Sequence, residues 1–245
     1  MIITASGSDT GRLREENQDW CAVKRFESGE ILALVCDGMG GENGGNIASA
    51  AAGSAITGYI AENLGKKRRA DIRELLCTAV RRANDDIYRM AGENEDLRGM
   101  GTTAVAVMLD AQGDTLHIVN VGDSRAYQVR GEGIRQLTRD HSVVQMMVDN
   151  GEITEAEART HPKKHFITRA VGVMKELDVD YITADIMDGD VILLCSDGFS
   201  NYFEIDEIYS MLKESVDGLA EKLIAAANAR GGADNITVVL MTKKD

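Results

Sequence analysis

Two apolar runs of this chain end in almost the same way. Residues 31–36 have the sequence ILALVC and residues 191–196 have the sequence VILLCS, and the Asp-Gly pairs that follow them begin at Asp37 and Asp197. A short, uncharged run rich in β-branched and leucine residues and closed by a turn signal is typical of a fully buried strand. Each run therefore predicts a strand that carries one carboxylate to the edge of the core. Because two such carboxylates repel each other and a buried unpaired charge is costly, the pattern favours a divalent cation between them.

Strand-like and helix-like patterns come in blocks along the chain rather than in alternation. The first 35 residues predict two or three strands, and later strands are expected at 102–109, 115–121, 125–129, 179–186, 191–196 and 236–241. Helices are expected at 44–64, 69–91, 205–213 and 219–229. This block order favours an α+β fold with mainly antiparallel sheets. Two sheets packed face to face, with helix pairs outside, would bury this many apolar strands.

The length of 245 residues fits one large domain and is short for two. No Pro/Gly/Ser-rich linker divides the chain, so we expect a single domain over residues 1–245. Residues 138–172 are polar and hold the only proline, Pro162, which predicts an excursion from the sheet with short helices.

The charge and the cysteines restrict the partners and the compartment. The 40 acidic residues outnumber the 27 basic ones and give a net charge of −13, whereas nucleic acids are bound by basic surfaces. No apolar stretch approaches the roughly 18 residues needed to cross a bilayer, and no signal-peptide pattern is present. None of the four cysteines forms a C-x-x-C pair, and Cys36 and Cys195 lie inside apolar runs. We therefore expect reduced thiols and a cytoplasmic protein that binds neither nucleic acid nor membrane.

Two further aspartates lie at the ends of predicted strands. Asp123 follows the apolar run that ends at Val121, and Asp234 precedes the last strand. One Asp-Gly pair most often marks only a turn, but four aspartates at the ends of apolar strands favour a shared metal site. Because the donors are oxygens with no histidine or cysteine nearby, they favour Mg²⁺ or Mn²⁺ over Zn²⁺.

A polar segment near the N-terminus adds a cation. Residues 14–19 have the sequence REENQD and begin with Arg14. A guanidinium group can bind a phosphate through two parallel hydrogen bonds, although Arg14 on its own is more simply interpreted as a solvated surface cation.

Taken together, these motifs resemble the metal-dependent serine/threonine protein phosphatases of the 2C type, the PPM class, in their compact bacterial form. The resemblance extends from the N-terminal segment to the last strand and implies a four-layer α/β-β/α sandwich. It rests on Arg14-x-x-Asn17-x-Asp19, Asp37-Gly38-Met39-Gly40-Gly41, Gly101-Thr102-Thr103, Gly122-Asp123-Ser124-Arg125, Ser196-Asp197-Gly198 and Asp234-Asn235. Each motif is short, but six of them in one order form a specific signal.

The resemblance implies a metal-binding role for each aspartate at a strand end. Asp37 is expected to bridge two ions, with the carbonyl of Gly38 on one of them. Asp197 and Asp234 are expected to bind the other ion. Asp123 resembles the ligand of a weaker third ion, which it would share with Asp197.

Two residues are expected to act beside the ions. Asp19 resembles the residue that orders metal-bound water, and Arg14 resembles the arginine that holds the substrate phosphate. Two divalent ions about 4 Å apart can activate a water molecule near neutral pH and offset the charge of the phosphate, so no nucleophilic side chain is required. Animal members of the family have a histidine directly after the Asp-Gly pair, where this chain has Met39. A metal-bound water is therefore the expected general acid.

The excursion at 138–172 corresponds to the flap that borders the active site in this family. Its basic and imidazole side chains either contact a phosphopeptide or face solvent: Arg159, His161, Lys163, Lys164, His165 and Arg169. The resemblance leaves open whether Ser142 contacts the third ion. His117 lies in a predicted strand, where a satisfied position in the sheet is expected rather than a catalytic role.

The expected activity is hydrolysis of phosphoserine and phosphothreonine in proteins modified by a Ser/Thr kinase, by a monomeric enzyme. The motifs specify phosphate hydrolysis and not the leaving group, so a phosphatase for a small molecule or for one dedicated regulatory phosphoprotein stays open. A catalytically silent binding or sensor module would lack Asp37, Asp197 or Asp234, and all three are present. Nucleotide binding by residues 38–45 is disfavoured, because no Gly-Lys-Ser/Thr follows and Asn43 breaks the G-x-G-x-x-G spacing.

Overall fold

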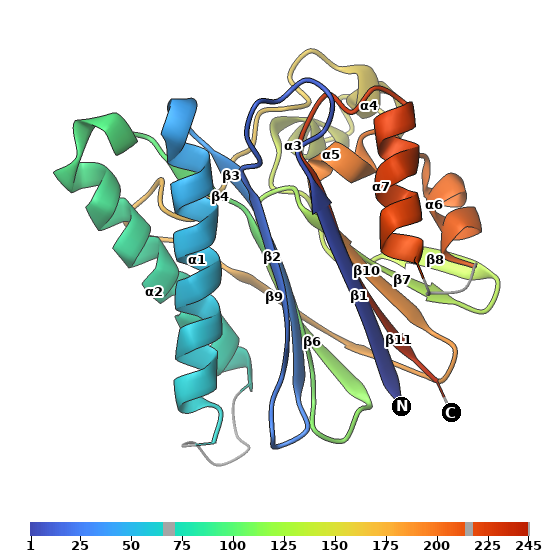
Figure 1. The fold of residues 1–245 in the computed structure, drawn as a ribbon. Helices are drawn as coiled ribbons and strands as arrows, with labels where there is room; N and C mark the ends of the chain where they lie inside the picture. The colour runs from blue at the N-terminus through green and yellow to red at the C-terminus, as the bar shows by residue number, and fades with distance from the viewer. Residues whose placement is uncertain (66–71, 214–217, 245) are drawn as a thin grey trace.

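Strands from the two ends of the chain pair side by side in the computed structural model, which describes residues 1–65, 72–213 and 218–244 (Figure 1). β1 (Ile2–Asp9) pairs with β11 (Ile236–Lys243) along its whole length. The other strands of this sheet are β10 (Val191–Cys195), β7 (Arg125–Arg130) and β8 (Gly133–Gln136), in the order β1-β11-β10-β7-β8.

The second sheet is built from the middle of the chain. Its strands are β2 (Asp19–Arg25), β3 (Ile31–Met39), β5 (Ala104–Leu109), β6 (Thr115–Val121) and β9 (Asp180–Asp185), in that order, and β4 (Gly101–Thr102) also pairs with β3. The neighbouring strands of both sheets are antiparallel, as expected from the block order.

The two sheets face each other, and helices cover both outer faces (Figure 1). α1 (Gly41–Asn63) and α2 (Ile72–Glu93) cover the second sheet. The helices on the first sheet are α5 (Asp197–Ser200), α6 (Ile205–Leu212) and α7 (Leu219–Ala229). The predicted four-layer α+β sandwich is therefore confirmed.

The apolar runs are uncharged because each of these strands is buried on both faces. In β3, Val35 packs into the layer between the sheets, whereas Leu34 packs against the helices outside. In β10, Leu194 faces inward and Leu193 faces the outer helices. Alternate side chains point to opposite faces of a strand, so a central strand between two apolar layers needs apolar residues at every position.

Several short elements differ from the sequence prediction. The expected strand at 102–109 is broken at Thr103. Its N–H still donates to the carbonyl of Asp37 in β3 at 2.8 Å, but the N–H of Asp37 donates to Thr103 Oγ1 and not to the Thr103 carbonyl, so the ladder is interrupted there. The helix expected from residue 44 begins at Gly41, and the predicted start of the next helix at 69–71 lies outside the described residues. The prediction missed β8, α5 and a 3₁₀ turn at Glu95–Leu97, which are too short to show a periodic pattern.

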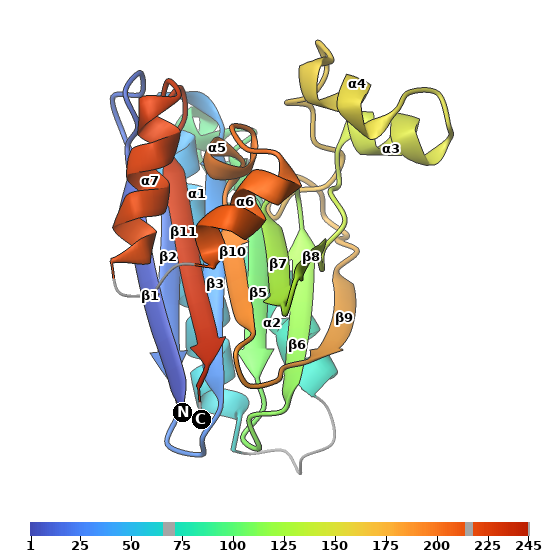
Figure 2. The ribbon, with the colours of Figure 1, turned by 90° about the vertical axis from the view of Figure 1, so that its right-hand side faces the viewer.

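Residues 138–172 leave the first sheet after β8 and carry α3 (Val143–Asp149) and α4 (Glu155–Thr160). Figure 2 shows the two helices projecting beyond one end of the sandwich. We call this segment the flap. Its base is tied by isolated bridges between Ser142 and Ile167 and between Thr102 and Val171. The excursion and its short helices were expected from the sequence.

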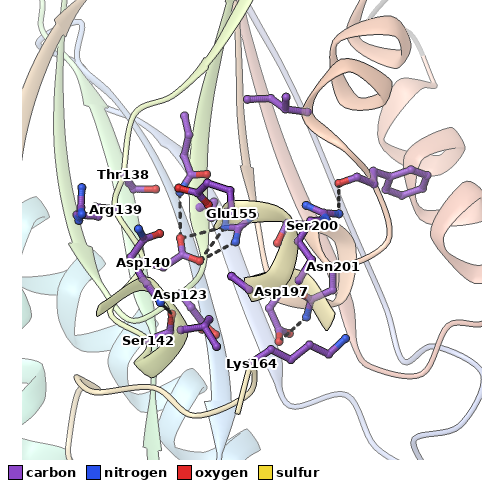
Figure 3. Close-up of a pocket in the computed structure, with 18 of the residues that line it drawn as sticks. Asp123, Thr138, Arg139, Asp140, Ser142, Glu155, Lys164, Asp197, Ser200 and Asn201 are labelled. Atoms are coloured by element: carbon purple, nitrogen blue, oxygen red, sulfur yellow. Dashed lines mark hydrogen bonds and ion pairs between the residues drawn. The ribbon is translucent and has the colours of Figure 1, made fainter. Parts of the chain in front are cut away.

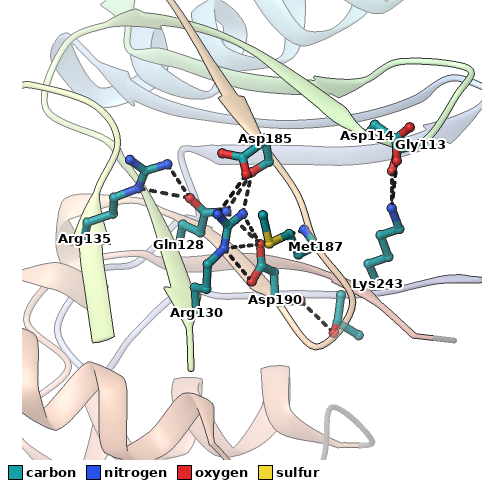
Figure 4. A network of polar contacts seen from close by, with 10 residues as sticks. Gly113, Asp114, Gln128, Arg130, Arg135, Asp185, Met187, Asp190 and Lys243 are labelled. Carbon is teal, nitrogen blue, oxygen red and sulfur yellow. Dashed lines mark hydrogen bonds and ion pairs between the residues drawn. The ribbon is translucent and has the colours of Figure 1, made fainter. Parts of the chain in front are cut away.

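A polar network links the two sheets at the start of β10, the end of the sandwich opposite to Asp197 (Figure 4). Asp190 is 1% exposed and accepts hydrogen bonds from Arg130 Nη2 at 2.6 Å and from Gln128 Nε2 at 2.8 Å. Arg130 Nη1 also donates to Asp185 at 2.8 Å. Since Asp185 ends β9 in one sheet and Arg130 ends β7 in the other, the network joins the two sheets.

Candidate active site

All five predicted aspartates lie at one end of the sandwich. Asp37, Asp123, Asp197 and Asp234 line one cavity of about 700 Å³ at the ends of strands of both sheets. Asp19 does not line the cavity, but it is paired with Asp37 across β2 and β3. Residues directly opposite each other in an antiparallel pair point to the same face, so Asp19 lies beside Asp37.

The backbone of Asp37 is held by two threonines of the Gly-Thr-Thr motif. Its N–H donates to Thr103 Oγ1 at 2.9 Å, and its carbonyl accepts from Thr102 Oγ1 at 2.9 Å. Thr103 Oγ1 is also 2.7 Å from the hydroxyl of Ser124, next to Asp123. These threonines fix the position of one carboxylate relative to another, a function that the sequence pattern did not reveal.

The glycines of both Asp-Gly pairs are required by close backbone packing. A Cβ atom at Gly38 would lie 2.0 Å from the carbonyl oxygen of Gly45, and one at Gly198 would lie 2.0 Å from that of Asn235. Neither glycine has a positive φ angle. The requirement for glycine therefore comes from the neighbouring backbone, which excludes a side chain, and not from a left-handed conformation.

Asp19 is a buried carboxylate with incomplete hydrogen bonding. Ser196 Oγ donates to its Oδ2 at 2.7 Å, while its Oδ1 has no partner among the described residues. Burial, with smaller effects from the charges of Asp197 and Asp234, raises the pKa of Asp19 to about 7, against hydrogen bonds that lower it. A buried acceptor without a donor is costly, so this oxygen is suited to a hydrogen bond from a water molecule.

Ionisation is also disfavoured for three of the carboxylates that line the cavity. Burial first, and then the charges of Asp19 and Asp197, raise the pKa of Asp37 well above its usual range. Burial and the neighbouring charge of Asp234 raise the pKa of Asp197, although a hydrogen bond with Asp37 opposes the shift. Burial and the charge of Asp197 likewise raise the pKa of Asp123. Cations in the cavity would reverse these effects, because they favour the charged carboxylates.

The donor set fits hard divalent cations. The cavity offers carboxylate and carbonyl oxygens, which Mg²⁺ and Mn²⁺ prefer, and the orphaned Asp19 Oδ1 beside it can hold a water molecule. Within the described residues, no three Asp, Glu, His or Cys side chains are already arranged so that together they could hold a metal ion. Asp234 is paired with Arg14 instead, and Asp37 shares a hydrogen bond with Asp197.

Arg14 lies at the rim of the cavity. Its Nη2 donates to Asp234 Oδ2 at 2.9 Å, and half of its side chain remains exposed. The loop that carries it is fastened by Asn235, whose Oδ1 accepts from the N–H of Gln18 at 2.8 Å and whose Nδ2 donates to the carbonyls of Thr10 and Glu16 at 2.9 Å. The asparagine of the Asp-Asn motif thus positions the predicted phosphate-binding loop.

His141 is a structural neighbour of Asp123 that sequence reasoning missed. The N–H of Gly122 donates to His141 Nδ1 at 3.1 Å, and the N–H of His141 donates to the carbonyl of Gly122 at 2.9 Å. Its Nε2 is 3.2 Å from Asp180. The histidine therefore connects the turn that carries Asp123 to the base of the flap. Its partners are distant in sequence, so no local pattern could have identified it.

The basic side chains of the flap separate into two groups. Lys164 and His165 line the cavity, where a phosphorylated substrate would enter. Arg159 and Arg169 are paired with Glu204 and Asp180 outside it. His117 has the expected structural position in its strand, with Nδ1 2.6 Å from the hydroxyl of Tyr181.

Comparisons with known proteins extend over nearly the whole chain. The protein phosphatase 2C family model matches residues 11–235. The serine/threonine phosphatase Stp of Listeria monocytogenes is 36% identical over 238 residues, which cover 96% of this chain and 94% of that protein.

Solved structures show the same fold at comparable identity. The serine/threonine phosphatase Stp1 from Staphylococcus aureus superposes with a TM-score of 0.93 at 30% identity, covering 100% of this chain and 96% of that one. The catalytic domain of PstP in complex with two manganese ions has a TM-score of 0.86 at 33% identity, covering 100% and 99% of the two chains. Because the family model and these relatives span nearly the whole chain, the protein belongs to the protein phosphatase 2C family, as a bacterial PPM-type phosphatase.

Proposed function

We propose that this protein hydrolyses phosphoserine and phosphothreonine in other proteins at a centre of two divalent cations, Mn²⁺ or Mg²⁺. The observation that carries the proposal is the cavity itself. Four strand-end carboxylates surround it, and an arginine lies at its rim. The related Stp and Stp1 proteins are serine/threonine phosphatases, and the related PstP domain binds two manganese ions.

In this proposal each strand-end residue has a defined task at the cations. Asp37 would contribute to both ions, together with the carbonyl of Gly38 at one and with Asp197 and Asp234 at the other. Asp123 and Asp197 would hold a weaker third ion. When bound, the ions supply a nucleophilic water and neutralise the charge of the phosphate.

The remaining residues bind and orient. Arg14 exchanges its hydrogen bond with Asp234 for the substrate phosphate, to which a guanidinium can donate two hydrogen bonds. Asp19 accepts a hydrogen bond from water through its free Oδ1. Met39 lines the cavity but cannot donate a proton, so the leaving oxygen receives its proton from water.

Removal of the cations tests the proposal. We expect Mn²⁺-dependent hydrolysis of p-nitrophenyl phosphate and of a phosphothreonine peptide, and both activities should disappear with EDTA. Asp37→Ala and Asp197→Ala should each lower kcat at least about 100-fold in a protein whose circular dichroism is unchanged. Hydrolysis that survives EDTA and both substitutions would reject a metal-dependent mechanism.

Substitution of Arg14 separates binding from chemistry. We expect Arg14→Ala to raise KM for the phosphopeptide about 10-fold with a smaller effect on kcat, because it removes contacts made before and during the reaction. Arg12→Ala is the matched control in the same loop, since Arg12 does not line the cavity. An unchanged KM in the Arg14 variant would exclude phosphate binding by this side chain.

The proposal extends to partners and compartment. Its substrates are phosphoproteins made by a Ser/Thr kinase, and the enzyme acts as a monomer. The four cysteines are free, which is typical of the reducing cytoplasm. Within the described parts of the chain, no helix is both long enough and apolar enough to cross a membrane. A phosphatase for small molecules is the second candidate, and a higher kcat/KM on small phosphate esters than on every phosphopeptide would favour it.

A further inference from the structure

A second cavity lies beside the catalytic one, between the flap and the core. It has a volume of about 580 Å³ and shares Asp123, Lys164, Asp197 and Asn201 with the catalytic cavity. We call it the flap pocket. Figure 3 shows Asp123, Asp197 and Lys164 close together on one side of it. A molecule bound at the catalytic cations can therefore extend into the flap pocket without leaving the protein surface.

The flap pocket has an apolar wall to which both the flap and the core contribute. Val144 and Ala158 are the buried residues of the flap helices, and both line the pocket. Ile208 and Phe203 line it from the core side and are 1% and 3% exposed. The apolar surface of the flap therefore borders an open space rather than a filled interface, and such a cavity can take up a ligand of matching chemistry.

The charged groups on the floor of the pocket are already satisfied by one another. Arg125 Nη2 donates to Asp140 at 2.7 Å, and its Nη1 donates to the hydroxyl of Tyr127 at 3.1 Å. Gln136 Nε2 also donates to Asp140 at 3.0 Å. A charged ligand group would have to enter without a free partner on this floor, which is costly. This floor therefore favours an uncharged, apolar group, whereas Glu155 and Lys164 line the pocket elsewhere.

One polar group of the pocket lacks a partner. Ser200 is 1% exposed and lines the pocket, and its hydroxyl oxygen makes no hydrogen bond within the described residues (Figure 3). The oxygen is itself buried, so it does not face a ligand in this structure. The pocket therefore offers a polypeptide segment its apolar wall rather than a hydrogen bond from this group.

We propose that the flap pocket binds an apolar side chain close to the phosphorylated residue of a polypeptide substrate, so that it selects among phosphoproteins. This inference rests on the proposed function, because the phosphate must occupy the adjoining catalytic cavity. The wall common to the two cavities limits the apolar residue to a few positions from the phosphorylated one, since an extended chain advances by about 3.3 Å per residue. Side chains from the flap and from α6 hold it on opposite sides.

A peptide series tests the selectivity directly. The series consists of alanine-based phosphothreonine peptides in which each of the three positions on either side carries Leu or Asp in turn. We expect the Leu peptide to exceed the Asp peptide in kcat/KM by about 10-fold at one or two of these positions, as is typical of an apolar specificity pocket. Differences below twofold at all positions would overturn the inference.

A substitution that fills the pocket links this selectivity to the structure. Ala158→Phe should lower about 10-fold the ratio of kcat/KM for the preferred Leu peptide to that for p-nitrophenyl phosphate. Thr160→Phe places the same ring on the same helix outside the pocket and should leave the ratio unchanged. An unchanged ratio in the folded Ala158 variant would assign the selectivity to another surface.

Ile205→Glu provides a second variant that does not depend on packing inside the core. Ile205 lines the pocket and is 41% exposed, so the protein should fold with a carboxylate there. We expect the preference for Leu over Asp to widen further as the Asp peptide is repelled, and a preference equal to that of the wild type would count against the pocket. Hydrolysis of every phosphopeptide at one common rate would reject the pocket alone, whereas no hydrolysis of any phosphopeptide would reject the proposed function as well.

Discussion

Single residues of the active site are determined by contacts with distant backbone. Gly198 follows Asp197 in sequence, but the carbonyl oxygen of Asn235 is what excludes a side chain at this position. Asn235 in turn holds the loop that carries Arg14. A side chain at Gly198 would therefore disturb Asp197 and the loop that carries Arg14 together.

Gly198→Ala tests this coupling. Its Cβ atom would lie 2.0 Å from the carbonyl oxygen of Asn235, so α5 or β11 must shift. We expect kcat/KM for p-nitrophenyl phosphate to fall at least about 10-fold, because displacement by 1 Å is sufficient for losses of this size. Gly58→Ala in α1 is the control, since a Cβ atom there meets nothing within 4 Å and helix propensity favours alanine. Equal activity of both variants would show that the close approach is not required.

Sequence patterns marked the carboxylates of the cavity better than the residues that support them. Asp37 and Asp197 are recognisable because each ends an apolar run, a local signal. Thr103 and His141 act through hydrogen bonds to residues far along the chain, so nothing in their own neighbourhood marks them. The break at Thr103 illustrates the same limit for strands, because local propensity favours one continuous strand and only the hydroxyl of Thr103, which accepts from the N–H of Asp37, interrupts the ladder.

At the scale of elements, the buried imidazole ring of His141 joins the flap to the turn that carries Asp123. Gly122 donates to His141 Nδ1, so the ring carries its proton on Nε2, toward Asp180. Burial lowers the pKa of His141 more than its carboxylate neighbours raise it. A second proton on the ring would remove the acceptor for Gly122 and loosen the turn.

His141→Phe removes both the Nδ1 acceptor for Gly122 and the imidazole group that can take up a proton. We expect a loss of about 1–3 kcal/mol at pH 7.5, because a buried N–H of Gly122 is left without a partner. The pKa is lower in the folded than in the unfolded chain, so the stability that the neutral ring contributes is present above pH 6.5 and is lost as the pH falls below it. Urea unfolding at pH 7.5 and 5.5 should thus show a smaller pH effect in the variant than in the wild type. An equal effect in both proteins would assign the titration to other groups.

At the scale of the whole molecule, the two ends of the sandwich have separate tasks. The ends of β3 and β10 carry carboxylates of the candidate active site, and the start of β10 is fixed by Asp190 and Arg130 (Figure 4). The four-layer arrangement could be predicted because apolar runs without alternation require cover on both faces. The network at Asp190 could not, because its members come from β7, from the end of β9 and from the connection between β9 and β10, and its charged members look like ordinary surface charges in the sequence.

Asp190→Ala should destabilise the protein without affecting catalysis. Removing Asp190 takes a buried acceptor from Gln128 and from the partly exposed Arg130, which should cost about 1.5–3 kcal/mol and lower Tm by roughly 3–12 °C for a chain of this size. We expect kcat at 25 °C to stay within twofold of the wild type. Asp188→Ala, at an exposed position in the same loop, should change Tm little. A variant of Asp190 that melts like the wild type would contradict a joining role for the network.

The pairing of β1 with β11 affects the order in which the domain can fold during synthesis. β11 lies between β1 and β10 in its sheet and is synthesised after every other strand that the structure describes. Asp234 and Asn235 directly precede it. The loop that carries Arg14 therefore lacks its hydrogen bonds to Asn235 until this strand has docked. A nascent chain that still lacks β11 therefore has no competent active site, and phosphatase activity is withheld until synthesis of the domain is complete.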